Sequence, residues 1–226
     1  MNFSEFEKEY ISIRTKEGRV YPDEIVKRLP FIDDAEWRIR ARSARKLLHQ
    51  LKKENCSSFV EIGCGNGWLT NYLQRELNAT AVGIDVNKTE LEQAERLSES
   101  KAEFYYGDIF SDDLKAFRSG TIIFAASIQY FGDLEKLFEL FSGTIHIIDS
   151  PFYEDAAAAR LRSEKYFESK DADRMKQFYF HHEFKSLMKY EHQFLYKPSR
   201  VRKFLGDSPF PYIRIRKDSS VSWQSR

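Results

Sequence analysis

The 226-residue sequence has few cysteines, no long apolar run and almost no net charge. Its two cysteines, Cys56 and Cys64, are too few for a disulfide framework and suit a reducing compartment. No segment approaches the ~18 consecutive apolar residues that a membrane-spanning helix needs. The acidic start MNFSEFEKEY also lacks the apolar centre of a signal peptide. We therefore expect a cytoplasmic protein without a membrane partner.

The formal net charge of +1 indicates no acidic partner by itself, but the charge is unevenly distributed. Residues 51–150 contain 9 Lys and Arg against 16 Asp and Glu, a net charge of −7. Residues 160–226 contain 16 Lys and Arg against 8 Asp and Glu, a net charge of +8. The simpler interpretation is an acidic helix surface followed by a basic hairpin surface. The alternative is a basic wall that faces an anionic substrate.

Aromatic residues make up 15% of the chain and hydrophobic residues 42%, which indicates one folded domain rather than disorder. Residues 1–34 are predicted to be irregular. Residues 35–53 have the apolar spacing of an amphipathic helix, and its arginines form a solvated face in the simplest interpretation. From residue 58, short apolar runs alternate with helical segments, as in βαβ units whose parallel sheet is covered on both faces. The predicted strands are 58–62, 80–85, 102–106, 121–126 and 144–148, and the predicted helices between and after them are 66–77, 88–98 and 132–141.

The last third of the chain is predicted to begin with helices over 155–169 and 172–189. Two further strands, 192–196 and 212–217, are expected to end the sheet as an antiparallel pair. The fold class is therefore α/β, with a doubly wound and mostly parallel sheet.

A glycine-rich segment, Glu61-Ile-Gly-Cys-Gly-Asn-Gly67, follows a predicted strand and opens a predicted helix. Glycines permit a tight turn and close approach to a ligand, and the helix start offers free N–H groups. We expect a nucleotide-like ligand across this turn, at the carboxyl ends of the strands. A dinucleotide fingerprint would need glycine at position 68, which is Trp. The Glu61 carboxylate would also repel a pyrophosphate, whereas it suits an ammonium group.

Two aspartates lie at the ends of the next two predicted strands. Asp85 lies 18 residues after Gly67, where a carboxylate can accept hydrogen bonds from both hydroxyls of a ribose. Asp108 follows the third strand, where it can accept from an adenine amino group while Ile109 covers the ring. Taken alone, Asp85 could be a helix cap and Asp108 a turn residue. Their position at successive strand ends favours a nucleotide site.

These segments resemble class I S-adenosylmethionine-dependent methyltransferases, over roughly residues 45–150. VEIGCGNGWLT resembles their first motif, GID (83–85) their acidic motif and GDI (107–109) their adenine-contacting motif. The resemblance implies a seven-stranded sheet with its last strand antiparallel, and S-adenosyl-L-methionine as cofactor. The cofactor-binding residues that it implies are Glu61, Gly63, Cys64, Gly65, Asn66 and Gly67 on the methionine part, Asp85 on the ribose, Asp108 and Ile109 on the adenine, and Val86 and Ser127 as further neighbours.

The segment Ala126-Ser-Ile-Gln-Tyr-Phe131 follows the fourth predicted strand, which in this family ends near the reactive methyl group. It lacks the Asn/Asp-Pro-Pro-Tyr signature of enzymes that methylate exocyclic or amide nitrogens, and so resembles the small-molecule branch. Gln129 and Tyr130 could orient the sulfonium or the acceptor, and a tyrosine face can stabilise a sulfonium cation. Alternatively, these residues surround a helix cap beside core residues.

Asp149 and His181 are the remaining catalytic candidates. Asp149 follows the fifth strand and could be a general base, help hold a metal, or cap the next helix. His181 could deprotonate an acceptor, although a lone histidine is more often structural, and its neighbour His182 would face another direction on a helix. No spacing of His, Cys and Asp resembles a standard metal site. The pair Tyr166 and Lys170 matches a dehydrogenase motif, but its distance from the glycine motif does not.

We therefore expect one methyltransferase domain over 1–226, which transfers a methyl group to a small-molecule acceptor by in-line displacement. The expected parts are an extension and helix (1–53), a cofactor-binding core (58–150), a helical cover (151–190) and a terminal strand pair (191–226). The acceptor is expected to be partly apolar or anionic. The alternatives are a non-catalytic S-adenosylmethionine-binding protein, a nicotinamide-dependent oxidoreductase and a nucleic-acid methyltransferase, the last favoured only by the basic stretches of the C-terminal part. The sequence does not indicate an oligomeric state.

Overall fold

The structure is a computed structural model that describes residues 2–98, 102–170, 172–199, 201, 204 and 206–217. The α-helices are α1 (Phe3–Lys16), α2 (Asp23–Val26), α3 (Ala35–Lys53), α4 (Trp68–Leu77), α5 (Lys88–Leu97), α6 (Leu134–Glu139) and α7 (Ala156–Ser169). The strands are β1 (Ser58–Ile62), β2 (Thr80–Asp85), β3 (Ala102–Tyr106), β4 (Ser119–Ala125), β5 (Ser142–Ile148), β6 (Phe152–Tyr153), β7 (His182–Glu183), β8 (His192–Tyr196) and β9 (Tyr212–Lys217). Short 3₁₀ helices are η1 (Asp112–Phe117), η2 (Ile128–Tyr130), η3 (Asp173–Phe178) and η4 (Phe184–Leu187).

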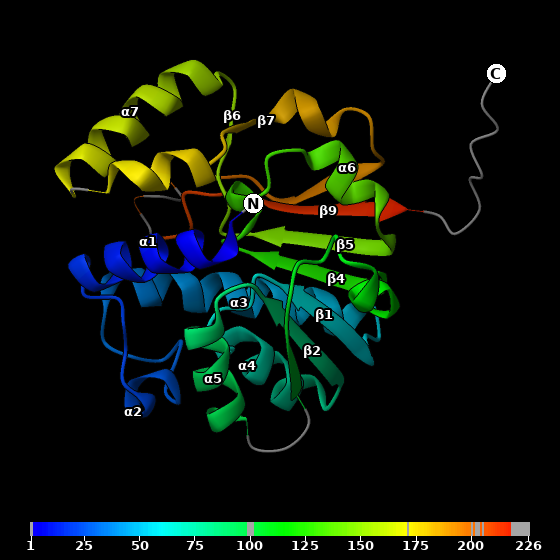
Figure 1. Ribbon diagram of the computed structural model, residues 1–226. Helices are drawn as coiled ribbons and strands as arrows, with labels where there is room; N and C mark the ends of the chain where they lie inside the picture. Colours follow the sequence, from blue (N-terminus) through cyan, green and yellow to red (C-terminus); the bar gives the residue numbers. More distant parts are fainter. Residues whose placement is uncertain are drawn as a thin grey trace.

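Seven strands form the main sheet in the order β3-β2-β1-β4-β5-β9-β8. The first five are parallel, whereas β9 runs antiparallel to both β5 and β8. In Figure 1 the arrowheads of β4 and β5 point toward the side where α1 and α7 lie, and β9 points the opposite way. The doubly wound α/β sheet and its terminal antiparallel pair are therefore confirmed, and the carboxyl ends of the parallel strands face α1 and α7.

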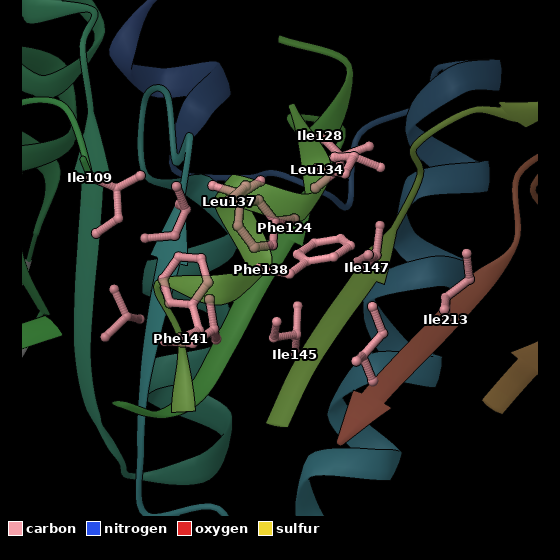
Figure 2. Close-up of a cluster of buried hydrophobic side chains, with 14 of the residues drawn as sticks. Ile109, Phe124, Ile128, Leu134, Leu137, Phe138, Phe141, Ile145, Ile147 and Ile213 are labelled. Atoms are coloured by element: carbon pink, nitrogen blue, oxygen red, sulfur yellow. The ribbon is translucent and has the colours of Figure 1, made fainter. Parts of the chain in front are cut away.

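Both faces of the sheet are covered because its central strands are apolar on both sides. On one face, α3 and α4 bury a cluster that includes Leu47, Leu51, Leu69 and Leu73, each with no exposed surface. On the other face, α6 packs Leu137 and Phe138 against β4 and β5, as Figure 2 shows. The sheet is consequently rigid, and its strand ends can hold side chains in fixed positions.

The N-terminal 34 residues are not irregular, contrary to expectation. Helix α1 starts at Asn2, whose side chain accepts a hydrogen bond from the Glu5 N–H at 3.2 Å. Phe6 and Ile13 are buried with Phe167 and Phe178 from the last third of the chain. The helix is therefore stabilised by residues about 160 positions away in the sequence, a contact that the local pattern does not reveal.

The expected helix over 172–189 is also wrong. Two 3₁₀ helices, η3 and η4, flank the short strand β7 instead. In β7, His182 pairs in parallel with Phe152 of β6 and Glu183 pairs with Tyr153. Aromatic side chains favour strands where a partner strand is available. The segment 178–184 is rich in aromatic residues, and its strand β7 pairs with β6, which follows β5 in the chain.

No helix among the described residues is long and apolar enough to cross a membrane.

Candidate active site

The glycine turn between β1 and α4 has a conformation that demands glycine. Gly63, Gly65 and Gly67 have φ angles of +73°, +54° and +71°, in the left-handed region. A Cβ on Gly63 would lie 2.5 Å from the Cβ of Ser127, and one on Gly67 would lie 2.7 Å from the Phe104 ring. The turn is thus packed on both sides while its outer surface lines a crevice at the strand ends.

Asp85 at the end of β2 holds this turn in place. Its Oδ2 accepts a hydrogen bond from the Gly65 N–H at 2.7 Å, and its Oδ1 accepts one from the Asn87 N–H at 2.8 Å. Burial raises the pKa of this carboxyl, although the backbone donors act in the opposite direction. One carboxylate therefore joins the glycine turn to the start of α5, and its remaining lone pairs are available to a ligand in the crevice.

Glu61 is the buried acid of the same crevice. It is 2% exposed and accepts a hydrogen bond from the Thr70 hydroxyl. Burial, with the neighbouring charge of Asp85, raises the pKa of Glu61 to about 8. The raised pKa favours the protonated carboxyl at neutral pH, and a cationic ligand beside it would favour the ionised form.

Two crevice residues at the start of α5, the N-cap Asn87 and Glu90 in the first turn, are not among the residues that the sequence predicts. Asn87 is 1% exposed, and its Oδ1 caps the helix by accepting from the Glu90 N–H at 3.1 Å. Its Nδ2 has no hydrogen-bond partner among the described residues. The Glu90 side chain turns toward Gly65, and burial raises its pKa to about 8. The spacing of Asn87 and Glu90 signals a helix cap, and only the fold shows that both line the crevice.

Helix α1 covers the crevice. Phe6, Tyr10 and Arg14 from this helix line it. The backbone N–H and the hydroxyl of Thr89 donate hydrogen bonds to Glu7 Oε1, at 2.9 and 2.8 Å. This contact attaches α1 to the start of α5, so the extension forms part of the site.

An alternating chain of charges crosses the covered side of the site. Glu17 pairs with Arg14 at 2.9 Å and with Arg19 at 3.2 Å. Glu36 pairs with Arg19 and, at 2.9 Å, with Arg40. The three arginines and two glutamates carry a net charge of +1. Arg14 of α1 and Arg40 of α3 therefore line the same crevice as the strand-end acids Glu61 and Asp85.

Some of the other predicted cofactor residues line the crevice, and others lie outside its lining. Cys64, Asn66 and Ser127 line it, and Ser127 donates its hydroxyl to the Ile62 carbonyl at 2.7 Å. Val86 packs beside the α1 cluster. Asp108 accepts from the Phe110 N–H at 3.1 Å. Ile109 is 2% exposed in the main core. An adenine contact of these last two residues stays a prediction.

A larger chamber of about 700 Å³ adjoins the crevice, and both are lined by Arg14, Glu36, Arg40 and Tyr130. Gln129, Tyr130 and Asp149 line the chamber, so three of the four catalytic candidates lie together. Tyr166 also lines it and donates its hydroxyl to Glu17.

His181 lies apart from the other three candidates. It lines a neighbouring cavity of about 530 Å³, and its Nε2 is 2.8 Å from the Ser163 hydroxyl. Burial lowers its pKa. Ser163, Phe167 and Tyr179 separate the two cavities, since they line both. A catalytic role of His181 remains a prediction that this position does not favour.

Asp149 has a strained backbone and a firmly held carboxylate. Its φ of +50° is unusual for a residue with a side chain, and Ala126 at the end of β4 has a φ of +54°. Asp149 Oδ1 accepts from the hydroxyls of Ser43 at 2.6 Å and Ser208 at 2.9 Å. Burial raises its pKa, and the charge of Arg40 opposes this.

No group of three or more His, Cys, Asp or Glu among the described residues could hold a metal ion.

The seven-stranded sheet, with its glycine turn and acids at successive strand ends, has the same fold as solved methyltransferase structures. Residues 59–145 match the family model described as a methyltransferase domain. No curated protein matches the sequence significantly.

Solved structures share the fold at low sequence identity. Human N-acetylserotonin methyltransferase, solved with SAM, is 17% identical with a TM-score of 0.53, over 78% of this chain and 52% of that one. This chain thus spans about half the length of the human enzyme. Magnesium protoporphyrin IX methyltransferase from Synechocystis, solved with SAH, is 12% identical with a TM-score of 0.52, over 80% and 84% of the two chains. The plantazolicin methyltransferase BpumL, solved with SAH and a desmethyl analogue, is 17% identical with a TM-score of 0.51, over 96% and 98%.

The position of Asp85 predicts that its removal weakens the fold as well as any ligand contact. Asp85→Ala would leave two backbone N–H groups without their charged acceptor, so the free energy of unfolding should fall by about 2–4 kcal/mol. Asp85→Asn keeps one acceptor oxygen and should lose less. Urea unfolding of the ligand-free protein measures both, with exposed Asp112→Asn as the control. An unchanged unfolding midpoint in Asp85→Ala would contradict this role.

The buried Glu61 predicts a pH-dependent stability of the ligand-free protein. Its pKa is raised in the folded state to about 8, so the folded protein binds a proton that the unfolded chain releases above about pH 4.5. Stability should therefore fall as the pH rises from about 5 to 8. Glu61→Gln should reduce this fall, and exposed Glu76→Gln should not. Equal pH profiles for wild type and Glu61→Gln would refute the assignment.

Proposed function

We propose that this protein transfers the methyl group of S-adenosyl-L-methionine to a small-molecule acceptor. The observation that supports this most strongly is the junction of two spaces: a crevice lined by the glycine turn and strand-end acids opens into a separate chamber. A transferase that joins a bound donor to a second substrate needs this arrangement. Methyl transfer then requires that the two reactants be held in line.

The chemistry of the crevice residues fits the cofactor. Glu61 can pair with the ammonium of its methionine part, while Arg14 and Arg40 can attract the carboxylate. The Asp85 and Glu90 carboxylates can accept from the ribose hydroxyls, and the orphaned Nδ2 of Asn87 can donate to a cofactor acceptor atom. When bound, the cofactor supplies an electrophilic methyl carbon on a sulfonium sulfur. Tyr130 at the junction can stabilise that cation with its ring.

The parts of the chain outside the core form the chamber and bind the acceptor in this proposal. Helix α1 and the start of α3 supply one wall, and α7 with η3 supplies another, so residues 1–53 and 151–190 act as cover. The chamber volume of about 700 Å³ suits a drug-sized molecule. The names of the human and Synechocystis relatives, an N-acetylserotonin and a porphyrin methyltransferase, support a small-molecule acceptor.

A cytoplasmic location belongs to the same proposal. Its support is that Cys56 and Cys64 are both free thiols, which persist most readily in a reducing compartment.

Cofactor choice can be tested by thermal unfolding. S-adenosylhomocysteine at a hundred times its Kd should stabilise the folded state by about 2.7 kcal/mol, which corresponds to roughly 5–10 °C in Tm for a domain of this size. NAD should give no shift, because Trp68 stands where a dinucleotide-binding turn needs glycine. A shift with NAD and none with S-adenosylhomocysteine would refute the proposed function.

A further inference from the structure

One side chain of the chamber has an unused hydrogen-bond acceptor. Gln129 is 6% exposed, and its Nε2 donates to the Ala126 carbonyl at 2.6 Å. The reverse orientation of the amide would bring two oxygens together, so this contact fixes which atom is Oε1. Oε1 is buried and has no partner among the described residues. A buried acceptor without a donor is unfavourable, and a ligand that donates a hydrogen bond to it would remove that cost.

A second acceptor lies at the end of the neighbouring strand. The pairing of Ala125 with Ile148 continues as a hydrogen bond from the Ala126 N–H to the Ile148 carbonyl at 3.0 Å. Gln129 and Asp149 therefore follow adjacent strand ends, and both line the chamber. The serine hydroxyls that hold Asp149 both donate to Oδ1. Its Oδ2 receives no hydrogen bond from the part of the chain that the structure describes.

Four arginines line the chamber, and three of them are paired with acids: Arg14 and Arg19 with Glu17, and Arg19 and Arg40 with Glu36. The fourth, Arg162 on α7, acts electrostatically on Tyr153 and His181. The Tyr166 hydroxyl donates to Glu17. The floor of the chamber beside Tyr130 thus offers two acceptor atoms from adjacent strands, and the group that rests on it has to supply the donors.

We propose that the acceptor of the methyl group is a primary or secondary amine with an apolar body. An amine in its ammonium form carries at least two N–H donors and can contact Gln129 and Asp149 together. An alcohol carries one donor, and an ionised carboxylic acid carries none. This inference rests on the proposed methyl transfer and specifies its substrate class.

The apolar side chains that line the chamber suit the apolar body of such an amine. Apolar side chains that line it are Ile13, Ile39, Phe167, Met175 and Phe210. Tyr130, Tyr153 and Tyr179 line it as well, and the ring of Tyr179 lies edge-on to Tyr130 with centroids 6.0 Å apart. Aromatic faces attract ammonium groups, and the attraction persists when the nitrogen gains methyl groups.

The reaction balances with the groups present. The ammonium first gives one proton to the Asp149 carboxylate, whose raised pKa makes it a better base. The freed nitrogen lone pair then forms the N–C bond to the methyl carbon. The S–C bond breaks, and its electron pair stays on sulfur. The products are the methylated ammonium, S-adenosylhomocysteine and a proton on Asp149, which passes to solvent.

Three probes that differ mainly in one group test the proposal: 2-phenylethylamine, 2-phenylethanol and 3-phenylpropionate. Each is titrated by calorimetry at pH 8 into the full chain saturated with S-adenosylhomocysteine. We expect the amine to bind at least tenfold more tightly than the alcohol or the acid. Tighter binding of either of those, or no binding of the amine, overturns the inference. Failure of S-adenosylhomocysteine itself to bind would instead overturn the proposed function.

Variants separate the proposed contacts from effects on folding. Asp149→Asn should weaken amine binding at least tenfold and leave the affinities for S-adenosylhomocysteine and the alcohol within twofold. Gln129→Met, which keeps the size of the side chain, should weaken amine binding several-fold. Exposed Asp113→Asn is the matched control and should change nothing. Unchanged amine affinity in both Asp149→Asn and Gln129→Met would contradict the proposal even if one variant folded poorly.

Discussion

The Asp85 carboxylate makes the contact on which the site depends. By accepting the N–H groups of Gly65 and Asn87, it joins the turn after β1 to the helix start after β2. The three glycines can then keep left-handed conformations against Ser127 and Phe104. Contacts within the chain therefore hold the shape of the crevice, which reduces the ordering that a ligand would have to supply on binding.

The same arrangement places three acids in a poorly hydrated space. Burial raises the pKa values of Glu61, Asp85 and Glu90 and so favours their protonated forms. Two non-glycine residues at strand ends, Ala126 and Asp149, also have left-handed backbones. Strain and buried charge of this kind commonly gather where a protein binds or reacts with a ligand. Here both features coincide at the crevice and the chamber.

The sequence predicted the sheet well because its strands are short apolar runs between clear turn signals. The predicted bounds of 58–62, 80–85, 102–106 and 212–217 agree with β1, β2, β3 and β9. The two failures, α1 and the 172–189 segment, depend on contacts made far along the chain. Phe6 of α1 packs on Phe178, and His182 pairs with Phe152. No local pattern of apolar spacing contains that information.

The candidate site was predictable in part for the same reason. Residues at or just after strand ends, such as Glu61, Asp85 and Asp149, are predictable because the ends of parallel strands meet at one edge of the sheet. Arg14, Asn87 and Glu90 were missed because a helix surface with charges looks solvated until a covering element is known. The amphipathic pattern of residues 35–53 predicts that Arg40 on α3 is exposed to solvent. In the structure, Arg40 lines both the crevice and the chamber.

A crystal structure of the protein with S-adenosylhomocysteine tests the central claim most directly. We expect electron density in the crevice, with the ligand's ammonium beside Glu61, its ribose beside Asp85 and its sulfur facing the chamber at Tyr130. Density for the ligand elsewhere on the molecule, or an empty crevice at a saturating ligand concentration, would contradict the account.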